Sequence, residues 1–124
     1  MLKVNEVAFF CYPVTDMARS RKFYEEVLGL KPTKVTKTEG GNWVEYDIGA
    51  TTLGLGQAPG WRPSNEGGNV ALEVDDFEKS IAALKSEKVP FAMEPLETPV
   101  CHMAIISDPD GSRLLIHKRK PGHN

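Results

Sequence analysis

Residues 14–30 of the chain read VTDMARSRKFYEEVLGL, and residues 74–91 read VDDFEKSIAALKSEKVPF. Both stretches begin with a valine, reach an aspartate at the third residue, and continue with interspersed charged and apolar residues. A shift of sixty residues places Asp16 on Asp76. The two stretches therefore indicate a chain that is built from two copies of one structural unit.

Each stretch predicts an amphipathic helix with a defined start. Thr15 or Asp16 can cap the first helix, and Asp75 or Asp76 can cap the second. Each of these side chains accepts hydrogen bonds from the backbone N–H groups of a first turn. Apolar residues then follow at steps of three and four, so they share one face of each helix. We expect these helices near residues 16–28 and 76–87.

Strands are expected on both sides of each helix. Residues 4–14 are apolar, aromatic and β-branched, which predicts a first strand, and residues 69–74 predict its counterpart. Three further strands follow each helix, with Gly-rich or Asp-Pro-Asp-Gly turns between them. Each half therefore has the order βαβββ. We expect a single domain with modules at 1–57 and 68–124, joined by a Gly- and Pro-rich linker at 57–68.

This tandem repeat predicts an α+β fold. A mostly antiparallel sheet with one helix on one face leaves its other face available for binding. We expect two such sheets, placed edge to edge, to form a cup with the helices outside. The concavity of that cup is the expected place for a small-molecule ligand.

The composition excludes several classes of partner. The chain has 124 residues, 40% of them hydrophobic, and a formal net charge of −2 with both signs interspersed. This balance argues against nucleic acid and against an anionic membrane surface as partners. No apolar run reaches the roughly 18 residues of a membrane span, and no secretory signal is visible. Cys11 and Cys101 lie in apolar surroundings, which favours reduced thiols in a cytoplasmic protein.

Three motifs resemble those of a known family. The stretch DMARSRKFYEEVLGL is similar to the first-helix motif of the vicinal oxygen chelate superfamily, which includes glyoxalase I, bleomycin-resistance proteins and extradiol dioxygenases. The stretch GNVALEVDD resembles the start of that family's second module, and DPDGSRLLIHK resembles its final hairpin. This resemblance covers nearly the whole chain. It implies the fold described above and, in the family's enzymes, a divalent metal bound by His, Glu or Gln side chains in the cup.

The family's metal ligands map onto residues that are poor ligands here. The ligand of the first strand falls on Phe9, and its counterpart in the second module falls on Asn69. The ligand of the last strand falls on Leu115. Its equivalent in the first module falls on Leu55, or on Gly54 if the hairpins differ by one residue. Phenylalanine and leucine cannot coordinate a metal, and one asparagine amide is a weak ligand. We therefore predict no metal cofactor.

A metal site built from other residues is an alternative. His117 lies two residues beyond Leu115 on the same expected strand and therefore shares its face. His102 and Cys101 are adjacent, so only one of them can share that face, and Glu45 and Glu73 are further possible ligands. These residues have no compact ligand spacing. Otherwise His117 is a half-exposed residue at a strand end and His102 a surface residue.

The remaining candidates are aromatic. Trp43 and Tyr46 lie on one expected strand and Trp61 lies in the linker. Their rings can line a pocket or fill a core, because aromatic side chains dominate both environments. The expected ligand-binding set takes Trp43 and Tyr46 from these aromatic residues and adds the former metal positions and His117. It consists of Phe9, Trp43, Tyr46, Leu55, Asn69, Leu115 and His117.

These observations support three alternative functions. The first is a metal-free protein that binds a flat or apolar small molecule, as the resemblance to bleomycin-resistance proteins implies. The second is a divergent glyoxalase-like lyase, isomerase or dioxygenase. It would use an unrecognised metal or an acid–base pair of His117 and Glu73, since histidine titrates near neutral pH. The third is a structural or partner-binding protein. In each case we expect a homodimer, because paired strand edges are protected from aggregation.

Overall fold

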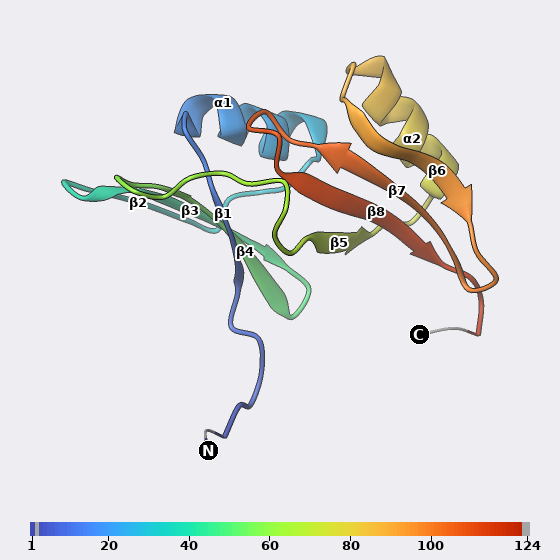
Figure 1. Ribbon diagram of the computed structural model, residues 1–124, viewed down its shortest axis with the longest axis horizontal. Helices are drawn as coiled ribbons and strands as arrows, with labels where there is room; N and C mark the ends of the chain where they lie inside the picture. Colours follow the sequence, from blue (N-terminus) through green and yellow to red (C-terminus); the bar gives the residue numbers. More distant parts are fainter. Residues whose placement is uncertain (2, 123–124) are drawn as a thin grey trace. The chain divides into compact units, whose positions relative to one another are not determined.

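The computed structural model describes residues 1 and 3–122 of the chain and is drawn in Figure 1. It divides into two compact units, Met1–Pro63 and Ser64–Asn124. The division falls inside the Gly- and Pro-rich stretch at 57–68. Each unit contains one four-stranded sheet and has the element order βαβββ.

The first unit is coloured blue to green in Figure 1. Its helix α1 continues without a break into a π-helical turn, η1. The elements are β1 (Phe10–Pro13), α1 (Met17–Lys22), η1 (Phe23–Val27), β2 (Lys34–Thr38), β3 (Gly41–Ile48) and β4 (Thr51–Gln57). The strands are ordered β1-β4-β3-β2 across the sheet, with β1 parallel to β4 and the other neighbours antiparallel.

The second unit, coloured olive to red in Figure 1, repeats this arrangement. Its elements are β5 (Val70–Glu73), α2 (Phe77–Ser86), β6 (Phe91–Glu97), β7 (Cys101–Ser107) and β8 (Arg113–Arg119). The strand order is β5-β8-β7-β6, again with one parallel pair, β5 with β8. The α+β class and the duplicated βαβββ order predicted from the sequence are confirmed. None of the helices in residues 1 and 3–122 has the length and apolar character that a membrane span requires.

Both helices begin at the second of the two candidate caps. The Asp16 side chain accepts from the backbone N–H of Arg19 at 3.1 Å, and Asp76 accepts from Lys79 at 3.0 Å. Both aspartates have an extended backbone, as an N-cap requires. The predicted helix near 16–28 is therefore found at 17–27, and the one near 76–87 at 77–86.

The first strand is shorter than the sequence predicts. It was expected over residues 4–14 but begins at Phe10, and residues 4–9 are exposed. Phe10 pairs with Leu53 in parallel register, and β4 itself begins only two residues earlier, at Thr51. Residues before Ala8 therefore have no β4 residue opposite them to pair with, even though their own sequence favours a strand.

One face of the first sheet is covered by the helix of the same unit. Residues directly opposite each other in neighbouring strands point to the same face, so Val44, Tyr46, Leu53 and Leu55 form one set. All four are buried. The Tyr46 ring stacks on Tyr24 of η1, with ring centroids 6.2 Å apart. The opposite face of a unit's sheet, which its own helix does not cover, is called here the helix-free face.

The second sheet is packed in the same way. Ala104 and Ile106 of β7 alternate with Leu114 and Ile116 of β8 to form its buried face. Leu84, the buried residue of α2, belongs to the same core. The intervening residues of β7 and β8 therefore point to the helix-free face of this sheet.

Candidate functional site

The two units can be aligned residue by residue through one shared hydrogen bond. The N–H of Val14 donates to the carbonyl of Gly56 at 2.8 Å, and the N–H of Val74 donates to the carbonyl of His117 at 2.9 Å. The offset between units is therefore sixty before the helix and sixty-one in the last strand. The second hairpin has one extra residue, so Gly54, and not Leu55, is the equivalent of Leu115.

This alignment decides between Leu55 and Gly54, the two candidates for the family's metal-ligand position in the first unit. Leu55 is fully buried on the helix-covered face, whereas Gly54 lies on the helix-free face. The residues at the four family positions are thus Phe9, Gly54, Asn69 and Leu115. Phe9 and Gly54 belong to the first unit, and Asn69 and Leu115 to the second.

Two glycines of β4 make room for aromatic rings on the helix-free face of the first unit. A Cβ atom at Gly54 would lie 2.5 Å from Cζ2 of Trp43, and a Cβ atom at Gly56 would lie 2.5 Å from Cζ3 of Trp61. Real Cβ atoms do not approach other atoms so closely. The rings therefore lie directly on the backbone of β4, which is one reason for glycine within a strand.

Three rings form a continuous set on this face, called here the aromatic row: Phe9, Trp43 and Trp61. Phe9 and Trp43 meet edge to face, with centroids 5.6 Å apart and planes at 78°. Trp43 and Trp61 do the same at 6.3 Å and 87°. Phe9 is 51% exposed and Trp61 is 47% exposed. A large aromatic surface is thus presented at the face where the family positions of this unit lie.

One carboxylate accompanies the aromatic row. The indole Nε1 of Trp43 donates a hydrogen bond to Oε2 of Glu45 at 2.6 Å. Glu45 pairs with Gly54 across the sheet and therefore points to the same helix-free face. This bond fixes the orientation of the Trp43 ring and leaves a polar group beside an apolar surface.

Tyr46 lies on the other side of the sheet from the aromatic row. It is fully buried, and its hydroxyl donates to Oε2 of Glu25 at 2.8 Å. Burial raises the pKa of the Tyr46 hydroxyl, and its hydrogen bond to Glu25 raises it further. Tyr46 therefore stays protonated as a donor in the core and is not among the residues brought together with Phe9 and Trp43.

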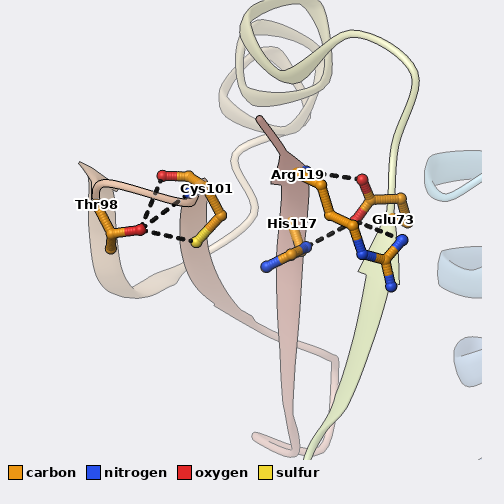
Figure 2. A network of polar contacts seen from close by, with 5 residues as sticks. All are labelled: Glu73, Thr98, Cys101, His117 and Arg119. Carbon is orange, nitrogen blue, oxygen red and sulfur yellow. Dashed lines mark hydrogen bonds and ion pairs between the residues drawn. The ribbon is translucent and has the colours of Figure 1, made fainter. Parts of the chain in front are cut away.

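The helix-free face of the second unit carries a polar cluster of Glu73, His117 and Arg119 (Figure 2). The His117 Nδ1 lies 2.6 Å from Oε1 of Glu73. The backbone N–H of Arg119 donates to Oε2 of the same carboxylate at 2.7 Å, and the guanidinium lies 3.7 Å from Oε1. Glu73 thus holds one ring nitrogen of His117. His117 shares its face with Leu115, as the sequence predicts.

Two opposing effects set the pKa of Glu73. Burial raises the pKa of this carboxyl. The hydrogen bonds from Arg119 and His117, together with the electrostatic attraction of the same two residues, outweigh the effect of burial. They hold the pKa of Glu73 below its usual range. The carboxylate is therefore ionised at neutral pH and is a strong acceptor for His117.

Among the other sequence candidates, Cys101 pairs with Arg119 across β7 and β8, whereas Asn69 and His102 lie apart from these sets. Asn69 is exposed and immediately precedes β5. Cys101 is buried, and its Sγ lies 3.2 Å from Oγ1 of Thr98 (Figure 2). His102 points to the helix-covered face of its sheet, where its ring lies 5.5 Å from that of Phe77. Both Cys11 and Cys101 are free thiols, and burial raises the pKa of Cys11.

A divalent metal does not fit the residues at the family positions. Phe9, Gly54 and Leu115 offer no side-chain donor, and Asn69 alone offers an amide oxygen, whereas catalytic metals need several carboxylate or imidazole ligands. Within residues 1 and 3–122, no three His, Cys, Asp or Glu side chains are gathered closely enough to hold a metal ion.

Sequence reasoning did not assign Trp61 to the binding set or identify the close packing of Trp43 on β4. A signal was present in the alternation of Gly54 and Gly56 within a strand, because such glycines often mark the close approach of another group. The sequence also left undecided whether Leu55 or Gly54 is the equivalent of Leu115, that is, whether the offset in the last strand is sixty or sixty-one. The equivalent hydrogen bonds of Val14 and Val74 resolve it.

Comparison with known proteins places this geometry in a family. The sequence model of the Glyoxalase/Bleomycin resistance protein/Dioxygenase superfamily matches residues 3–116. Among curated proteins compared by sequence, none matches the chain. Among solved structures, TnmS3, an antibiotic binding protein from Streptomyces sp. CB03234, is similar with a TM-score of 0.80 and 25% identity. The match covers 97% of this chain and 100% of that one.

Two further solved structures are similar to this chain. A glyoxalase/bleomycin resistance protein from Streptomyces sp. CB03234 has a TM-score of 0.73 and 26% identity, covering 93% of this chain and 100% of its own. The trypanothione-dependent glyoxalase I of Leishmania major has a TM-score of 0.77 and 25% identity, covering 93% and 87%. The similar structures thus include both a binding protein and an enzyme.

Proposed function

Because the chain belongs to the Glyoxalase/Bleomycin resistance protein/Dioxygenase superfamily, we propose that it is a small-molecule-binding protein that works without a metal ion. The likeness to an antibiotic binding protein supports the binding role. The residues at the four family positions support the absence of a metal, because only Asn69 among them has a side-chain oxygen.

The aromatic row is the observation that carries this proposal. Phe9, Trp43 and Trp61 expose apolar ring surface, and ligand sites are lined mainly by such side chains with a few polar groups. The Glu45 carboxylate, held by the indole N–H of Trp43, supplies a polar group at the same face. The ligand is therefore a flat, largely apolar molecule that stacks on the exposed rings of this row.

Titration with 2-naphthol and larger fused-ring phenols tests this proposal through the fluorescence of the two tryptophans. Binding at the aromatic row quenches Trp43 and Trp61, and Trp43→Ala weakens binding by roughly 1–3 kcal/mol, the usual contribution of one stacked ring. Tyr46→Phe serves as the matched control, because Tyr46 lies in the core. Equal affinity in the parent protein and in Trp43→Ala would contradict the proposal.

A separate experiment tests the metal. Adding Ni²⁺, Zn²⁺ or Mn²⁺ should leave the melting temperature unchanged, because a metal that binds only the folded state must stabilise it. Elemental analysis of the purified protein should give far less than one divalent metal per chain. One tightly held equivalent with His117 among its ligands would overturn the metal-free function.

A second candidate function is an acid–base enzyme, and one observation favours it. The His117 Nδ1 lies 2.6 Å from the ionised Glu73, an arrangement that orients a histidine to take or give a proton at Nε2. Such an enzyme would catalyse exchange of a proton next to a carbonyl group. Deuterium uptake by an α-hydroxyketone in D₂O, followed by NMR and abolished by His117→Ala and Glu73→Gln, would favour this function over simple binding.

We also propose that the protein is cytoplasmic and forms a homodimer. The free thiols of Cys11 and Cys101 support a reducing compartment. The exposed apolar residues Val4, Val7 and Phe10 support an interface that covers them.

A further inference from the structure

Helix α2 and the sheet of the second unit enclose a groove of about 620 Å³. This groove opens on the helix-covered face of the sheet, the opposite face from His117, so it is distinct from the sites discussed above. Its volume is within the range of small-molecule sites, about 300–1,000 Å³. The residues that matter for its chemistry are Asp75, Phe77, Glu78, Ile81, His102 and Lys118.

The first unit provides an internal comparison, because it has a groove at the equivalent place between α1 and its sheet. That groove measures about 300 Å³. Gln57 lines this groove, and its Oε1 accepts from the N–H of Met17 at 2.9 Å while its Nε2 donates to the carbonyl of Thr15 at 3.0 Å. The side chain of Gln57 therefore ties the start of α1 to β4.

The second unit lacks this tie. The offset of sixty-one places Lys118 where the first unit has Gln57, and the pairing of Lys118 with His102 matches that of Gln57 with Asn42. An ammonium group has no acceptor for the N–H of Phe77, the equivalent of Met17. The start of α2 therefore lacks a side-chain bond of this kind to β8, and the groove has about twice the volume of its counterpart.

The side chains that line the two grooves also differ in kind. Phe77 replaces Met17, and its ring lies 5.5 Å from that of His102 at an angle of 34°. Ile81 replaces Arg21 on the next turn of the helix. The second groove thus has an apolar wall with two rings, which suits an aromatic ligand.

The charged side chains around the groove determine whether it attracts a positively or a negatively charged ligand. Asp75, Asp76 and Glu78 contribute three carboxylates at the start of α2, and Lys118 contributes one positive charge. The start of a helix adds only about half a positive charge. Asp75 and Glu78 have no ion-pair partner in the described part of the chain. The balance is negative, so the groove repels anions and attracts cations.

From these observations we propose that the groove beneath α2 is a second ligand site, which binds a small aromatic molecule carrying a protonated amine. The ring packs on Phe77, His102 and Ile81, and the amine faces Asp75 and Glu78. No covalent step is involved.

Three probes with one ring system test this site on the full chain: 2-naphthylmethylamine, 2-naphthylmethanol and 2-naphthoate. Two-dimensional NMR with each probe maps where it binds. The amine should shift the amides of Phe77, Ile81 and His102 and should bind at least tenfold more tightly than the carboxylate, with the alcohol between them. Equal affinities for the amine and the carboxylate, or shifts confined to Trp43 and Trp61, would overturn the proposal.

Two variants separate the contributions. The double variant Asp75→Asn with Glu78→Gln removes two negative charges and keeps the shape of the side chains. It should weaken binding of the charged amine about tenfold and leave binding of the neutral alcohol unchanged. Lys118→Gln should recreate the tie of the first unit, raise the melting temperature and weaken all three probes. Gln57→Lys is the matched control and should not affect the probes at Phe77. Unchanged amine affinity in the charge variant would contradict the assignment of Asp75 and Glu78.

Discussion

The indole ring of Trp43 fills the space into which a side chain at Gly54 would project, because a Cβ atom there would lie 2.5 Å from the ring. The glycine and the tryptophan therefore depend on each other. Gly54→Ala should displace the ring and weaken its bond to Glu45, with a loss of about 1–3 kcal/mol in the free energy of unfolding. Urea unfolding and the tryptophan emission maximum measure both effects.

Gly67→Ala is the matched control for this experiment, since nothing lies within 4 Å of a Cβ atom at Gly67. It should leave stability and emission nearly unchanged. An equally small effect of Gly54→Ala would show that the Trp43 ring does not rest on β4.

The hydrogen bond from Tyr46 to Glu25 should contribute to the stability of the first unit. Tyr46→Phe removes the donor at a fully buried position, and Glu25 keeps its bond from Arg21, with Nε at 2.7 Å from Oε2. We expect a loss of about 1–2 kcal/mol in the free energy of unfolding, measured in urea at neutral pH. An unchanged free energy of unfolding in Tyr46→Phe would contradict this contribution.

Glu25 should also make stability depend on pH. Burial raises the pKa of Glu25, but the bonds from Arg21 and Tyr46 outweigh it and hold the pKa below the ordinary value of 4.5. The stabilisation is thus complete above pH 4.5 and is lost as the pH falls through the lowered pKa. Between about pH 7 and about pH 3, the parent protein should lose more stability than Glu25→Gln. Parallel losses in the two proteins would exclude this contribution.

Lys88 ends helix α2 in a conformation that favours glycine, with φ of 59°. A left-handed backbone costs a residue with a side chain about 1 kcal/mol or more. Lys88→Gly should therefore raise the free energy of unfolding by about 0.5–1 kcal/mol. Gly111→Ala, at φ of 85°, should change stability in the opposite direction, and thermal melting compares the two.

Exposed apolar side chains near the start of the chain should lie in a homodimer interface. Val4 and Val7 are both exposed in residues that form no strand. Light scattering at micromolar concentration should give the mass of two chains, and the double variant Val4→Glu with Val7→Glu should give one. A monomeric parent protein would contradict this expectation.

The sequence was most informative where one residue type has one structural role. Each helix was predicted to begin at one of two neighbouring caps, because few side chains can accept the N–H groups of a first turn. The second residue of each pair, Asp16 and Asp76, does so. The duplicated order followed from the same two helices. These features are local, so no knowledge of distant contacts was needed.

Features that depend on register could not be predicted in the same way. Leu55 and Gly54 are neighbours in a strand, and a shift of one residue exchanges the two faces of a sheet. The choice between them depends on how many residues join β7 to β8 compared with β3 to β4. Trp43 and Tyr46 are three residues apart on β3, so they necessarily lie on opposite faces, but only the packing of the sheet shows that Tyr46 is the one on the helix-covered face. The π-helical turn η1, which carries Glu25 towards Tyr46, has no counterpart in the sequence pattern.

The parallel pairing of β1 with β4 and of β5 with β8 has a consequence for how the chain folds during synthesis. In each sheet the strand made last lies between the first and the third, so the first strand has no partner until the whole unit has been made. β1 must wait for residues 53–56, and β5 for residues 114–117. The helix and the β2–β3 or β6–β7 hairpin can form early, but each sheet closes in a single late step that inserts its final strand.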